Sequence, residues 1–173
     1  MMGRERADNT VYNAAANLVI AALGGPADAT AKIAARAPAF AGVVIGRYML
    51  ASRARGDNTA TAAALAAVLG AIAAGRVPGV DAATGQAIAD AMLQAPDRAL
   101  GALRRKQGNL DNDPMVVIDT GYYAGAGGGA PVVFVVGAAL AAPPTGPRAA
   151  AHRRLDTLVT TVQRALRAAA AAR

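Results

Sequence analysis

Apolar residues recur at helical spacing along much of the chain, separated by short polar or glycine-rich breaks. The clearest stripe occupies positions i, i+3, i+4 and i+7 of one run and consists of Leu65, Val68, Leu69 and Ile72. Residues at this spacing share one face of an α-helix. A weaker stripe follows Asp8-Asn9-Thr10 and stops at Gly24-Gly25-Pro26, a sequence that ends helices. Further helices are predicted from Asp28, from Pro38 to about Arg53, from Asp81, and from Pro96 to Lys106.

Two of these helices share an opening motif. Arg4-Glu5-Arg6-Ala7-Asp8-Asn9-Thr10 and Arg53-Ala54-Arg55-Gly56-Asp57-Asn58-Thr59 both read Arg-x-Arg-small-Asp-Asn-Thr. Asp, Asn and Thr side chains accept hydrogen bonds from the free N–H groups of a first helical turn. The repetition predicts a duplicated three-helix unit, residues 4–52 and 53–107, within a helical domain spanning 1–108.

The pattern changes after Gly108. Met115-Val116-Val117-Ile118 and Val132-Val133-Phe134-Val135-Val136 are β-branched runs joined by a glycine-rich link, which predicts a two-stranded element over 109–142. Neither run alternates polar with apolar residues, so both faces are expected to be covered. Because an isolated ribbon is marginally stable, either helices sandwich it or strands of another subunit complete it.

A proline-rich hinge, 143–147, precedes a basic amphipathic helix over 148–173. This helix is the predicted interaction element, through Arg148, Arg153, Arg154, Leu155, Leu158, Val159, Val162, Arg164, Leu166 and Arg167. Three hypotheses apply to it: the apolar seam docks into a groove of the bundle or of a neighbouring subunit, the arginines track nucleic-acid phosphates, or the seam lies in a membrane surface. The first is preferred, and the third lacks a Trp or Phe anchor. The predicted fold class is mainly α: an Ala-rich helical bundle with a small two-stranded β element and a C-terminal helix.

Charge and composition narrow the function classes. The net charge of +7 makes acidic partners such as nucleic acid plausible, and Arg104, Arg105 and Lys106 form an alternative basic patch. The chain has no cysteine and one histidine, which excludes thiolate and His-rich metal sites. No signal peptide and no apolar run of the length of a transmembrane helix is recognised, so a cytoplasmic or virion location is expected.

Short motifs that resemble catalytic or cofactor signatures have simpler interpretations. Asp119-Thr120-Gly121 matches the aspartic-protease triplet, but those enzymes need two such carboxylates, and a strand ending in a turn is preferred. The glycine loop 125–129 matches a dinucleotide fingerprint but is followed by a strand instead of a helix. Asp111 and Asp113 do not fit the calcium-loop template with Asp119. No catalytic, cofactor-binding or metal-binding residue is therefore predicted.

Alanine takes the place of larger apolar residues in the predicted helices. Each buried alanine removes little apolar surface from water, so the chain gains by burying surface against copies of itself. The sequence thus predicts a non-enzymatic, self-associating subunit or adaptor of a larger particle, with homo-oligomers or other subunits as partners. A phage virion component is its most concrete version, and a nucleic-acid-binding protein that uses the C-terminal helix is the alternative.

Overall fold

A computed structural model describes residues 8–110, 114–140 and 146–172. The chain divides into two compact units, Met1–Met92 and Leu93–Arg173, which we call unit 1 and unit 2. Each is described by itself.

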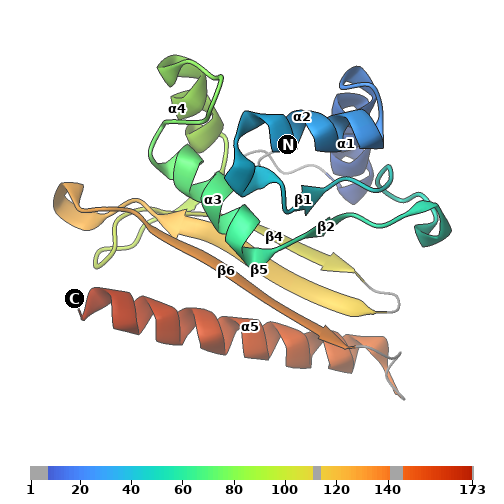
Figure 1. The fold of residues 1–173 in the computed structure, drawn as a ribbon. Helices are drawn as coiled ribbons and strands as arrows, with labels where there is room; N and C mark the ends of the chain where they lie inside the picture. Colours follow the sequence, from blue (N-terminus) through green and yellow to red (C-terminus); the bar gives the residue numbers. More distant parts are fainter. Residues whose placement is uncertain (1–7, 111–113, 141–145, 173) are drawn as a thin grey trace. The chain divides into compact units, whose positions relative to one another are not determined.

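Unit 1 is built from short helices and one small ribbon (Figure 1). Its elements are α1 (Asn9–Ala22), α2 (Pro26–Arg36), η1 (Pro38–Phe40), β1 (Val43–Val44), η2 (Arg53–Arg55), β2 (Thr59–Ala60), α3 (Ala62–Ala73) and α4 (Ala82–Asp90). Asp8 caps α1, accepting a hydrogen bond from the Val11 N–H at 2.9 Å, as its position in the motif predicts. Buried side chains are small or few in each helix, since α1 buries only Ile20 and α2 only Ala29.

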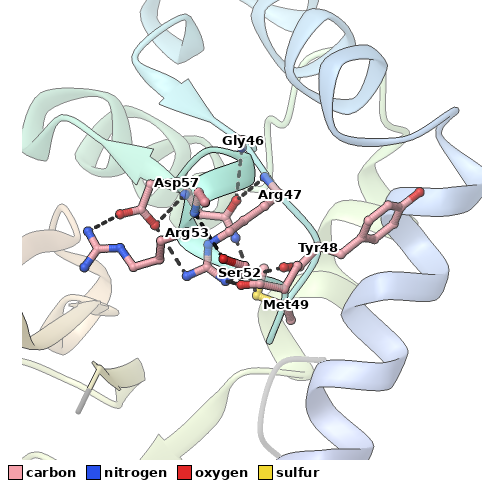
Figure 2. A network of polar contacts seen from close by, with 10 residues as sticks. Gly46, Arg47, Tyr48, Met49, Ser52, Arg53 and Asp57 are labelled. Carbon is pink, nitrogen blue, oxygen red and sulfur yellow. Dashed lines mark hydrogen bonds and ion pairs between the residues drawn. The ribbon is translucent and has the colours of Figure 1, made fainter. Parts of the chain in front are cut away.

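The segment between α2 and α3 is a hydrogen-bonded loop (Figure 2). Asp57 pairs with Arg47 and Arg53, while the Asn58 side-chain oxygen accepts from the backbone N–H groups of Gly46 and Arg47, each at 3.0 Å. A Cβ on Gly46 would stand 2.2 Å from the Asp57 carbonyl oxygen. Only glycine lets the two backbone segments approach this closely.

Unit 2 is a four-stranded antiparallel sheet with one long helix. The strands β3 (Leu93–Ala95), β4 (Leu103–Leu110), β5 (Met115–Tyr123) and β6 (Val132–Leu140) lie in sequence order, and α5 (Arg148–Ala171) follows them. The short turn η3 (Ala126–Gly128) connects β5 to β6. In Figure 1, α5 runs back along β6 in the opposite direction.

Helix α5 covers one face of the sheet, over β5 and β6. Its Ala151, Leu155 and Val159 pack into a core with Leu100, Met115, Val117, Tyr123, Phe134 and Val136. Because side chains alternate along a strand, Val116, Ile118, Tyr122, Val133 and Val135 lie on the other face. Apolar residues of β5 and β6 thus lie on both faces, and within unit 2 helix α5 covers one of them.

The predicted fold class, a mainly helical bundle with one small β element, is wrong, because the described residues form five α-helices together with a four-stranded and a two-stranded sheet. Two predicted helices are absent. The segment from Pro38 to Arg53 forms η1, β1 and the hydrogen-bonded loop, because Asp57 and Asn58 bind its backbone and arginines. The segment from Pro96 to Lys106 runs into β4, which pairs with β5 on one side and β3 on the other.

The two copies of the shared motif also differ in structure. Asp8 caps a helix, but Asp57 binds arginines, and the helix that follows is capped by Thr61, whose side chain accepts from the Ala64 N–H at 3.1 Å. Residues 4–7 of the first copy lie outside the described part of the chain. The predicted strands and C-terminal helix are present as β5, β6 and α5, and of the predicted hinge only Gly146 and Pro147 are described.

Candidate interaction surface

Strand β6 forms an edge of the sheet. It pairs with β5 along nine residues, from Tyr123↔Val132 to Met115↔Leu140, and within the described residues no strand pairs with its other side. In an antiparallel ladder, alternate residues direct both backbone N–H and C=O away from the neighbouring strand. These groups make β6 a template for a further strand.

Nothing in the sequence of β6 opposes such pairing. Natural sheets protect free edges with charged residues, proline or bulges, whereas Val132–Leu140 contains neither charge nor proline and pairs with β5 without a break in register. The stretch from Thr120 to Pro147 carries no Asp, Glu, Lys, Arg or His at all.

The apolar residues of α5 fall into two groups. Leu155 and Val159 are buried on the sheet, as is Ala151. Leu158, Val162 and Leu166 are 53%, 39% and 46% exposed, values that leave much of each side chain in water. Only part of the predicted apolar seam is therefore buried within unit 2.

A shallow apolar hollow continues this exposed surface. It measures about 160 Å³ and lies between the last turns of α5 and the start of β6, with Leu166, Ala170, Val132, Phe134 and Tyr123 in its lining. The Tyr123 and Phe134 rings meet there at 5.7 Å between centroids. Burial raises the pKa of the Tyr123 hydroxyl, and the nearby Asp97 carboxylate adds to that rise.

Arg167 shows which flank of α5 is directed toward the β3–β4 connection. Its Nε donates to Asp97 Oδ2 at 2.6 Å, and Asp97 belongs to the connection between β3 and β4. This flank of the helix is therefore directed toward the β4 side of the sheet. The hydrogen bond from Arg167 holds the pKa of the Asp97 carboxyl below its usual value.

The remaining predicted arginines of α5 do not converge. Arg148, Arg153, Arg154 and Arg164 are exposed, and at 100° per residue Arg153 and Arg164 lie on the outer surface of the helix while Arg154 lies on its side. The alternative patch is divided between two faces: Arg105 lies on the α5-covered face, and Arg104 and Lys106 lie on the opposite one.

Asp119 is the one buried charged side chain recorded in the described core, with 1% of its surface exposed. Its Oδ2 lies 3.3 Å from Arg105 Nη1 and 3.4 Å from Gln107 Nε2, both on β4. Its Oδ1 is buried and has no hydrogen-bond partner within the described residues. Loss of water raises the pKa of this carboxyl, and Arg105 offsets part of the rise.

The structure does not give the protease-like and dinucleotide-like motifs the surroundings that those functions require. The Asp119-Thr120-Gly121 triplet lies inside β5 and does not end it, because Gly121 lets the Arg104 carbonyl oxygen of β4 approach closely. The glycine loop 125–129 joins two antiparallel strands, as the hairpin interpretation predicts, and has no helix at its end. Asp111 and Asp113 lie outside the described residues. Among the residues that are described, no group of three or more His, Cys, Asp or Glu could hold a metal ion.

The sequence predicted α5 as the interaction element and left pairing with strands of another subunit as one of two alternatives, without identifying β6 as the edge strand. The uncharged stretch around Val132–Leu140 is visible in the sequence, but the order of strands that leaves β6 at the edge cannot be read from that stretch alone.

Within the described residues no single helix is long and apolar enough to cross a membrane. The pair α1 and α2 meets the length and composition of a span only when taken together, and the two helices are bent by 76° relative to each other.

No family model, no curated protein and no solved structure matches the chain.

Proposed function

We propose that this protein is a non-enzymatic, self-associating subunit of a larger assembly, and that unit 2 carries the self-association. The observation that supports the proposal most directly is the edge strand β6, nine residues long and without charge. An edge of this kind pairs readily with another chain, and the exposed α5 residues lie on the helix that runs beside it.

The energetics favour use of this surface. Fully burying a leucine or valine side chain contributes about 1.5–3 kcal/mol, and part of that gain is still open to Leu158 and Val162, which are 53% and 39% exposed. A second chain that covered both residues would bury their exposed apolar surface, and pairing with β6 would satisfy its free backbone groups.

Charge limits where two copies of the chain can meet. Two molecules of net charge +7 repel each other across most of their surfaces. The uncharged edge is a place where they can meet without opposing charges, and on the Leu158 flank of α5 the charged residue is Arg154, one turn before Leu158. The virion role predicted from composition is one setting for such a subunit, and the dispersed arginines give no support to the nucleic-acid alternative.

Light scattering tests the proposal. The mass in solution is expected to exceed the 17.2 kDa of one chain and to rise with concentration. Leu158→Lys places a charge in the exposed patch and should shift the protein toward the monomer. Thr160→Lys, which adds the same charge on the exposed outer surface of α5, is the matched control. A parent protein that stays monomeric up to high micromolar concentrations would overturn the proposal.

A further inference from the structure

The position of α5 over the sheet limits how two copies can join. Helix α5 packs on both β5 and β6, so its axis lies close to the free edge. Strands are spaced by about 4.8 Å. A helix axis above the midpoint between β5 and β6 is displaced by about 2.4 Å from β6 toward β5. When two β6 strands pair at about 4.8 Å, the two α5 axes are therefore separated by about 10 Å. Packed helices are separated by about 8–10 Å.

We propose that two copies pair their β6 strands antiparallel about a two-fold axis, and that their α5 helices pack side by side across it. The inference rests on the proposed self-association and specifies its partner and geometry. A two-fold axis that relates antiparallel neighbouring strands is perpendicular to the sheet, so both α5 helices lie on the same face. Two four-stranded sheets then become one continuous sheet.

The helix presents the right flank to this contact. Leu158 is nine residues from Arg167, which is two and a half turns of an α-helix and places the two on opposite sides. Since Arg167 is directed toward Asp97 beside β4, Leu158 is directed toward the free edge of β6. The same flank continues with Val162, Ala165 and Ala169, spaced i, i+4, i+7 and i+11 from Leu158.

This flank suits close helix contact. Leu158, Val162, Ala165 and Ala169 are all exposed, they repeat at the spacing of a helix–helix seam, and the two alanines let helix axes approach. Because α5 runs back along β6 (Figure 1) and its last turns lie over Val132 and Phe134, the middle of the helix lies over the middle of the strand. A two-fold axis near Val136 therefore passes near Leu158 and Val162.

Single-cysteine cross-linking tests the geometry, since the parent chain contains no cysteine. A residue can form a disulfide with its own copy only where a two-fold axis brings the two together. Leu158→Cys or Val162→Cys is expected to give a covalent dimer on oxidation. Ala169→Cys, at the far end of the flank, and Thr160→Cys, on the outer surface, should give at least about tenfold less dimer if the helices are antiparallel.

The outcomes separate this inference from the proposed function. Oligomers by light scattering without any single-cysteine dimer indicate head-to-tail contacts and would overturn the two-fold arrangement alone. Equal cross-linking at Leu158, Val162 and Ala169 indicates parallel helices and would also overturn it. A monomer by light scattering would remove both proposals.

Hydrogen exchange tests the strand contact independently of the helices. Alternate amides of β6 point away from β5 and exchange freely in a monomer, but become protected when a second strand pairs with them. Peptides covering Val132–Leu140 are expected to exchange more slowly at high than at low protein concentration, and the Leu158→Lys variant should lose the difference. Exchange in β6 that does not change with oligomeric state would contradict edge pairing.

Discussion

Asp119 stands where the sheet and α5 exclude water, and only one of its oxygens has polar neighbours in the described structure. Burial raises the pKa of its carboxyl above the ordinary 3.8, and Arg105 opposes the rise. The folded protein therefore binds the proton more tightly than the unfolded chain does. Ionised Asp119 disfavours folding at neutral pH, and this cost disappears as the pH falls through the folded pKa toward 3.8.

Replacing this carboxylate by its neutral amide should not destabilise the protein at neutral pH. For Asp119→Asn we expect a free energy of unfolding at pH 7.5 equal to or above that of the parent, with any gain shrinking as the pH is lowered toward 3.8, because protonation removes the charge of the parent carboxylate. Urea unfolding at pH 7.5 and at lower pH measures it. Asp156→Asn, at an exposed position of α5, is the control. A loss of more than about 1 kcal/mol at pH 7.5 would show that the Arg105 pair outweighs desolvation.

Leucines three residues apart on α5 have opposite roles. Leu155 is 5% exposed and packs on the sheet, whereas Leu158 is 53% exposed and contributes little inside the unit. At protein concentrations low enough to give monomers, Leu155→Ala should lower the free energy of unfolding by about 2–4 kcal/mol. Leu158→Ala should lower it by less than about 1 kcal/mol.

Chemical denaturation of the two alanine variants checks this difference at the same dilution as the parent. The proposed dimer buries Leu158 between copies, so it predicts that the cost of Leu158→Ala grows at high concentration. Equal losses for both variants in dilute solution would mean that α5 does not use Leu155 as its attachment to the sheet.

Elements with local signals could be predicted from the sequence, and elements made by distant partners could not. The β-branched runs that became β5 and β6, and the heptad-like seam of α5, carry their own pattern. Strand β4 does not: Leu103 followed by Arg104-Arg105-Lys106 is typical of a helix C-terminus. It is a strand because β3 and β5 pair with it on either side, an influence that outweighs local propensity.

For the candidate surface too, local patterns could be predicted from the sequence and the effects of distant contacts could not. The residues of the α5 seam could be named in advance, but their separation into buried Leu155 and exposed Leu158 depends on how the helix is rotated on the sheet. That rotation is set by packing on strands distant in sequence, and the hydrogen bond between Arg167 and Asp97, 70 positions apart, accompanies it. Likewise, Gly46 and Asp57 approach each other through a loop closure that neither local sequence indicates.

For the whole molecule, charge separates the two functional hypotheses. A chain of net charge +7 that associates through uncharged surfaces should associate as well or better when salt screens the repulsion between copies. Binding to nucleic acid should instead weaken steeply, because salt opposes the release of counterions.

Light scattering at 50 and 500 mM NaCl, with duplex DNA titrations at the same two concentrations, measures both responses. We expect the mass to be maintained or increased in high salt and any DNA binding to be lost. Self-association that fell in proportion to salt would point to contacts between charged groups, away from β6 and the Leu158 flank.

The order of elements in unit 2 has a consequence for its synthesis. The chain places α5 after the strands, so a ribosome makes the β5–β6 hairpin before the helix that shields it. During that interval, valines and aromatic rings on the α5-facing side have no cover from their own polypeptide. On polysomes carrying many nascent copies, these hairpins are close neighbours, and the edge pairing proposed for finished subunits is then also a route to aggregation before folding is complete. Slower translation between Leu140 and Arg148 should lengthen that vulnerable interval and lower the yield of native protein.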